Sequence, residues 1–107
     1  MESYTFKKLE NEEGRIKSLE IGGLLVLENA NDLKRDFLST SRVLGKQLKI
    51  NISDVSDIDL SFIQLLLAFI AEMNEQHVTF SLEWNLEDDQ KTLLENVGLS
   101  TELFINN

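Results

Sequence analysis

Alternation of apolar and polar residues predicts several short strands along the chain. Residues 4–9 alternate in this way, and residues 15–21 do so again after a polar turn that ends at Gly14, which indicates an N-terminal hairpin. Residues 47–53 and 77–84 show the same period of two, each with one apolar and one polar side. We therefore expect a sheet that is covered on one face and open to solvent on the other.

A helix is predicted between the hairpin and the third of these strands. Gly22–Gly23 is expected to interrupt the second strand, and Asn29 or Asn31 is a suitable residue to cap the helix that follows. Its apolar face extends to about Leu44, and Gly45 stands where a helix commonly ends.

Two further helices complete the pattern. Residues 61–76 connect the third and fourth strands, so the three elements predict a right-handed parallel βαβ unit. The last helix is expected from near Asn85 to Gly98, and residues 99–105 either pack on the domain or add an edge strand. The fold class is therefore α/β, a single domain over residues 1–107 with a mixed sheet and helices mainly on one face. The last helix is expected to bury Leu93, Leu94 and Val97.

Composition excludes several classes of function. The 107 residues carry a net charge of −9, which disfavours nucleic acid and anionic membranes as partners. The chain has no cysteine and one histidine, so disulfides, thiolate catalysis and histidine-rich metal clusters are excluded. The N-terminus has no apolar leader, and the longest apolar run, residues 65–71, is too short to insert into a membrane; we expect a cytoplasmic protein.

The acidic residues are concentrated in the second half of the chain. Residues 1–49 carry nine basic and eight acidic side chains, whereas residues 50–107 carry one basic and eleven acidic ones. A partner that contacts the second half is therefore expected to bring basic groups.

The segment after the third strand carries the candidate chemistry. It is expected to be a loop at the carboxyl end of a strand, the place where ligands and regulatory contacts gather in open α/β sheets. Asp54, Asp57 and Asp59 are either solvated turn residues or ligands of a divalent metal in a small enzyme. No further ligand set is identifiable, so the solvated interpretation is favoured.

Ser61 is predicted to cap the following helix. Ser61 and Gln64 have the spacing of a capping box, and Leu60 and Leu65 have that of the matching hydrophobic staple. Such a position also tolerates an added phosphate, because the N-terminus of a helix favours negative charge.

Three apolar residues of this helix lie between its core face and its polar face. Phe62, Leu65 and Phe69 either pack under the neighbouring helix, which is the favoured interpretation, or form an apolar patch for a partner. The predicted core face consists of Ile63, Leu66, Leu67, Ile70 and Met73.

Taken in order, these features resemble the STAS domain family, to which anti-sigma-factor antagonists belong. The resemblance covers nearly the whole chain and includes the hairpin and the strand Leu48–Ile52. The motifs that carry it are Gly23-Leu24-Leu25-Val26-Leu27-Glu28-Asn29-Ala30, Ile58-Asp59-Leu60-Ser61, Leu65-Leu66-Leu67-Ala68, Leu93-Leu94-Glu95-Asn96-Val97-Gly98-Leu99 and Glu102-Leu103-Phe104.

The resemblance implies a non-enzymatic protein-interaction domain without a cofactor. The family's loop commonly reads Asp-Ser-Ser-Gly, in which a partner kinase phosphorylates the second serine. Asp59 and Ser61 match that aspartate and serine, whereas Leu60, Phe62 and Gln64 replace small residues. The resemblance thus implies an anti-sigma-antagonist-like partner switch, with a constitutive adaptor of a lipid-transport ATPase complex as the alternative. The candidate partner-binding residues are Asp57, Asp59, Leu60, Ser61, Phe62, Gln64, Leu65 and Phe69.

Overall fold

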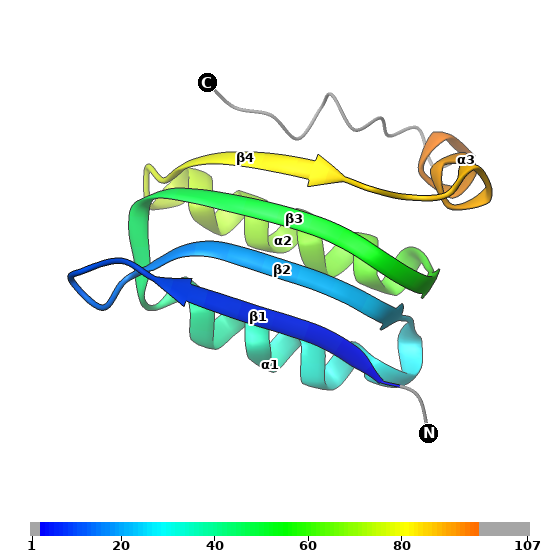
Figure 1. Cartoon of the computed structure of the whole chain (residues 1–107), viewed down its shortest axis with the longest axis horizontal. Helices are drawn as coiled ribbons and strands as arrows, with labels where there is room; N and C mark the ends of the chain where they lie inside the picture. Colours follow the sequence, from blue (N-terminus) through cyan, green and yellow to red (C-terminus); the bar gives the residue numbers. More distant parts are fainter. Residues whose placement is uncertain (1–2, 97–107) are drawn as a thin grey trace.

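Four strands form one sheet in the order β1-β2-β3-β4 (Figure 1). Strands β1 and β2 are antiparallel, whereas β3 runs parallel to both β2 and β4. The computed structural model describes residues 3–96. In chain order the elements are β1 (Tyr4–Glu10), β2 (Ile16–Leu25), a short 3-10 helix (Leu27–Asn29), α1 (Ala30–Ser41), β3 (Leu44–Ile58), α2 (Leu60–Glu75), β4 (Thr79–Trp84) and α3 (Asp88–Asn96).

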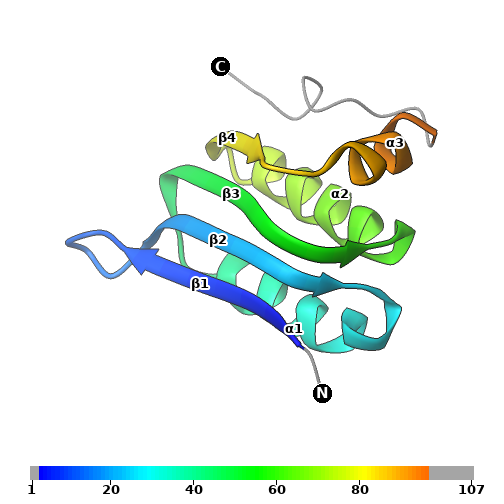
Figure 2. The ribbon, with the colours of Figure 1, turned by 45° about the vertical axis from the view of Figure 1, so that its right-hand side comes forward.

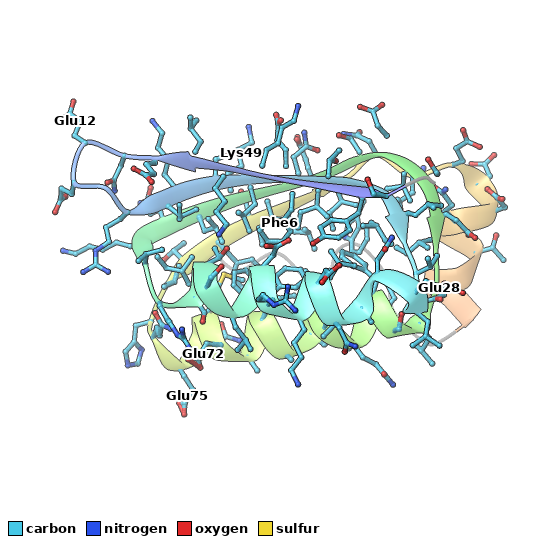
Figure 3. All side chains as sticks on the ribbon, turned by 90° about the horizontal axis from the view of Figure 1, so that it is seen from below. Phe6, Glu12, Glu28, Lys49, Glu72 and Glu75 are labelled. Atoms are coloured by element: carbon cyan, nitrogen blue, oxygen red, sulfur yellow. The ribbon has the colours of Figure 1, made fainter. Side chains whose placement is uncertain are left out.

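Helices α1 and α2 cover one face of the sheet, and the other face is uncovered (Figure 3). Helix α3 lies beyond the carboxyl end of β4 rather than on the sheet (Figures 1 and 2). These observations confirm the predicted hairpin, the mixed sheet and the parallel βαβ unit formed by β3, α2 and β4. Helix α1 connects β2 to β3, which are also parallel, so the fold contains a second crossover of the same kind.

The core lies between the sheet and the two helices, because each strand directs every second side chain toward them. Figure 3 shows Phe6 between the sheet and α1. The central strands supply fully buried aliphatic residues, which explains the strict alternation in their sequences. The buried apolar residues of β2, β3 and β4 include Leu19, Ile21, Leu48, Ile50, Ile52, Phe80 and Leu82.

Two strands are longer than the sequence predicts. Strand β2 continues through Gly22–Gly23 to Leu25, so the prediction that these glycines interrupt it is wrong. Residues 53–58 belong to β3 and not to a loop. The prediction failed because the pairing of β2 with β3 continues across a register shift near Gly23, where Asp54 adopts a positive φ of 54°. Alternation is lost at this irregularity, although backbone pairing resumes.

The helix boundaries also differ from the prediction. Helix α1 ends at Ser41, and Leu44 and Gly45 open β3, so Gly45 does not end a helix. His77 lies in the turn after α2 with a positive φ of 59°, and β4 begins two residues later. The last predicted helix starts later than expected, at Asp88 instead of near Asn85. The predictions for the side chains of Leu93 and Leu94, for Val97 and Gly98, and for residues 99–105 lie outside the described part of the chain.

Candidate functional site

Ser61 lies in the first turn of α2, at the carboxyl end of the sheet. β3 ends at Ile58 and α2 begins at Leu60, so a single residue, Asp59, makes the connection. The end of β2 lies beside it, since Leu25 pairs with Ile58. In Figure 1 this is the edge where the arrowheads of β2 and β3 lie, opposite the β1–β2 hairpin.

Asp59, and not Ser61, is the N-cap of α2. Asp59 has an extended backbone, and its Oδ1 accepts a hydrogen bond from the Ser61 backbone N–H at 3.0 Å. The Ser61 hydroxyl donates a second hydrogen bond to the same oxygen. The predicted capping box is therefore wrong by two residues: the Gln64 side chain is exposed and makes no hydrogen bond within residues 3–96. An aspartate caps a helix as well as a serine does, so either residue could have been chosen from local sequence alone.

The same carboxylate connects two segments that are far apart in the chain. Asp59 Oδ2 accepts a hydrogen bond from the backbone N–H of Leu27 at 3.0 Å, and the Asp59 N–H donates to the Leu25 carbonyl at 3.1 Å. Leu27 opens the 3-10 turn that leads into α1. Asp59 thus holds the start of α2 against the turn between β2 and α1. The Ser61 hydroxyl is connected to that turn through the same Asp59 carboxylate.

These hydrogen bonds keep Asp59 ionised. Burial alone would raise the pKa of its carboxyl group, but the hydrogen bonds from the Ser61 hydroxyl and from the backbone N–H groups of Leu27, Ser61 and Phe62 outweigh burial and lower the pKa below its usual value. The Ser61 hydroxyl therefore faces a carboxylate that is charged at neutral pH.

The other two candidate carboxylates do not join Asp59 in a cation site. Asp57 accepts a hydrogen bond from the N–H of Ile58 at 2.8 Å, and Asp54 is exposed at the irregular part of β3. No three histidine or acidic side chains between residues 3 and 96 are placed to hold a metal ion. The geometry of the described residues therefore gives no support to the metal-dependent enzyme.

Two of the three intermediate apolar residues of α2 are buried. Phe62 is 0% exposed and Phe69 is 4% exposed, and both rings pack against the ring of Phe37 on α1, with centroid distances of 6.1 and 4.9 Å. This confirms the favoured interpretation that they pack under the neighbouring helix. Leu65 is half-buried in the groove between the helices, whereas Leu67, assigned to the core from the sequence, is 39% exposed.

Sequence reasoning missed an exposed apolar residue beside Ser61. Leu27 is 68% exposed, although its backbone is fixed by Asp59, and Leu60 is 46% exposed. Leu27 stands in the short apolar run 24–27, in which Leu25 is buried, and it is exposed where the 3-10 turn into α1 begins. We call Leu27, Asp59, Leu60, Ser61 and Gln64 the Ser61 surface.

The comparison with known families identifies the chain. The family model for the STAS domain matches residues 9–107. The chain belongs to the STAS domain family. A search among curated proteins gave no match. Members of the family generally mediate protein–protein interactions and are generally not catalytic, and the mixed four-stranded sheet with helices on one face is consistent with the STAS fold. Within residues 3–96, no helix is long and apolar enough to cross a membrane.

Asp59 is expected to stabilise this STAS domain in a pH-dependent way. Because its pKa is lowered in the folded state, its contribution is present above the unfolded pKa of 3.8 and is lost as the pH falls through the lower folded value. Replacing Asp59 with Asn should lower the free energy of unfolding at neutral pH by about 1 kcal/mol, since Asn keeps the cap but loses the charge and one acceptor.

Urea denaturation of the wild type and Asp59→Asn from pH 7 downward tests this expectation. The difference between the two proteins should shrink as the pH falls from 3.8 through the lower folded pKa. A difference that stayed constant with pH would show that the carboxylate charge contributes nothing. Asp57→Asn is the matched control, because it removes the same charge from an exposed carboxylate that bonds only the adjacent backbone.

Proposed function

We infer that the protein is a partner-switching STAS module that binds another protein through the Ser61 surface and is regulated by phosphorylation of Ser61. In this proposal it is cytoplasmic, uses no cofactor and performs no catalysis itself. The partner is a regulator of the anti-sigma-factor type, which carries or recruits the serine kinase. Family membership supports the class of function, and the geometry at Ser61 supports the switch.

The observation that carries the proposal is the path from the Ser61 hydroxyl through Asp59 to Leu27. A phosphate on Ser61 removes the hydroxyl donor and adds about −1.5 to −2 charges beside a carboxylate that is already ionised. The resulting repulsion acts on the group that holds the Leu27 backbone. Modification would therefore change the charge of the surface and the position of its most exposed apolar residue together.

The substitution of the family's glycine by Phe62 is compatible with this proposal. The Phe62 ring points into the core and is fully buried, so its bulk does not project from the Ser61 surface. Gln64 is the larger residue that is exposed there. Among the three departures from the family pattern, Leu60 and Gln64, rather than the buried Phe62, are the ones that would select a particular partner.

A pull-down from the native cytosol with wild-type and Ser61→Asp baits tests the switch, together with the intact mass of the natively expressed protein. We expect a kinase-like partner that wild type retains and Ser61→Asp loses, and a species heavier by the mass of one phosphate, about 80 Da. Ser56→Asp is the matched control, because it adds the same charge at an exposed residue of β3.

Identical partners with both baits and no phosphorylated species would contradict the switch and favour the constitutive adaptor. Loss of the partner with both Ser56→Asp and Ser61→Asp would show a general effect of charge. The stability of Ser61→Ala separates folding from regulation. Since Asp59 is the cap, this variant should lose only one hydrogen bond, about 0.5–1.5 kcal/mol.

A further inference from the structure

A basic hollow lies at the opposite end of the sheet from Ser61. Two adjoining depressions of about 700 and 440 Å³ share Lys17 and Gln47 and extend from the β1–β2 turn across the start of β3 to β4. Four of the ten Lys and Arg residues of the chain line them, together with His77, and Glu13 is the one carboxylate in the lining. The four cations are Arg15, Lys17, Lys46 and Lys49.

Among the described residues, none of these four cations forms an ion pair. Between residues 3 and 96 the structure contains one ion pair, which joins Arg35 to Asp32 on α1. Neither of these residues lines the hollow. Lys49 lies between the buried Leu48 and Ile50 on β3, so it projects from the uncovered face of the sheet (Figure 3). A concentration of unpaired positive charge is unexpected in a protein with a net charge of −9.

The neutral residues of the hollow also offer hydrogen-bond donors. Asn11 is fixed by its Oδ1, which accepts the backbone N–H groups of Glu13 at 2.9 Å and Arg15 at 3.0 Å. Its amide nitrogen lies 3.3 Å from the position that a Cβ on Gly45 would take, so it faces the floor of the larger depression. Ser81 and Thr79 add hydroxyl groups in the smaller one. The lining thus suits a ligand that is rich in negatively charged oxygen acceptors.

The lining further indicates what kind of anion fits. Leu44 and Val78 are the apolar side chains among the residues around the larger depression, whereas small-molecule sites are mostly apolar with a few polar groups. The cations come from the turn, β2 and two parts of β3, so a ligand must be extended to meet all of them. We propose that the basic hollow is a second docking surface, for an extended acidic segment of a protein partner.

This docking surface is independent of the switch. It lies at the amino ends of the parallel strands, whereas Ser61 lies at the carboxyl end of β3. A partner held at one end therefore leaves the other end free. A phosphate on Ser61 should have little effect on the cations of the hollow. Charges separated by more than about 8 Å interact weakly at physiological ionic strength, because salt screens them. The protein would hold one partner constantly while it releases another.

Binding of a fluorescein-labelled peptide of alternating Glu and Gly residues, followed by anisotropy, tests the proposal, with a Gln-Gly peptide as the neutral control. We expect the full-length protein to bind the acidic peptide and not the neutral one, and salt to weaken binding. Lys17→Glu/Lys46→Glu should weaken binding about tenfold or more, since it places like charges against the peptide. Lys34→Glu/Lys91→Glu changes the net charge equally at exposed helical residues outside the hollow and should have an effect of about twofold or less.

An equal loss in the two double variants would overturn the proposal, because net charge would then explain the result. Failure of the wild type to bind the acidic peptide would overturn it as well, and so would binding of inorganic tripolyphosphate without binding of the peptide. Lys17→Gln/Lys46→Gln should lose less peptide affinity than the charge-reversal variant. Because it introduces no like charges, it also shows whether the loss in the reversal variant comes from misfolding. Ser61→Asp should bind the acidic peptide as the wild type does, so failure of the switch and failure of this docking surface are distinguishable.

Discussion

Replacing Phe62 with alanine is expected to lower the free energy of unfolding by about 3–5 kcal/mol, a large share of the stability of a domain of this size. The Phe62 side chain is fully buried, and its ring meets that of Phe37, which also contacts Phe6 and Phe69. The cavity would lie between α1 and the first turn of α2, beside the ring of Phe37. Urea denaturation followed by circular dichroism measures the loss.

Leu60→Ala is the matched control for Phe62→Ala. Leu60 lies two residues earlier in the same helical turn but is 46% exposed, so its truncation should cost less than about 1 kcal/mol. The two variants should also differ in binding. Leu60→Ala should weaken partner binding with little loss of stability, whereas Phe62→Ala should act through stability. Equal stability of the two variants would contradict the burial of the Phe62 ring.

The contrast between Phe62 and Leu67 shows what a helical wheel can and cannot predict. The wheel correctly placed Ile63, Leu66 and Met73 in the core, because one face of α2 must meet the sheet. It could not predict the direction from which a second helix approaches. Helix α1 lies beside α2 and covers the side that carries Phe62 and Phe69, so the buried stripe rotates toward these rings and away from Leu67.

Pairing across the sheet limits prediction in a similar way. The alternation of residues 47–53 predicted the regular part of β3, whose pairing with β4 is unbroken from Gln47 to Ile52. Residues 53–58 pair with β2 alone and across a register shift, so their pattern has no fixed period. Their polar composition is typical of a loop, and the backbone hydrogen bonds that make them a strand are not encoded in that composition.

At the candidate site, the sequence predicted the position of Asp59 and Ser61 at the start of a helix but not which of them caps it. Asp59 and Ser61 were selected correctly as neighbours at the start of a helix, because the spacing of polar residues before an apolar run is local information. Asp59 caps the helix through the nearby N–H of Ser61, but its carboxylate also accepts the N–H of Leu27, which is 32 residues away in the chain. No local pattern predicts a contact of that separation.

Replacing Gly22 with alanine is expected to prevent the native pairing of β2 and β3, with a loss of more than about 4 kcal/mol or failure to fold. A Cβ on Gly22 would lie 2.1 Å from the backbone carbonyl oxygen of Ser53, and backbone on a central strand cannot move aside as a side-chain tip can. The φ of Gly22 is not positive, so the whole effect is steric. The added methyl group would separate β2 from β3 at Ser53, within the strand that leads to Asp59.

Gly14→Ala is the control that separates crowding from backbone conformation. Gly14 has a φ of 77° but no atom within 4 Å of an added Cβ, so alanine there should cost only about 1 kcal/mol, the price of a left-handed conformation. Denaturation curves and amide proton NMR spectra of both variants distinguish the two causes. If Gly22→Ala were as stable as Gly14→Ala, β2 and β3 would have room to separate. The register that brings Asp59 to Leu27 would then not depend on the close approach of the two strands at Gly22.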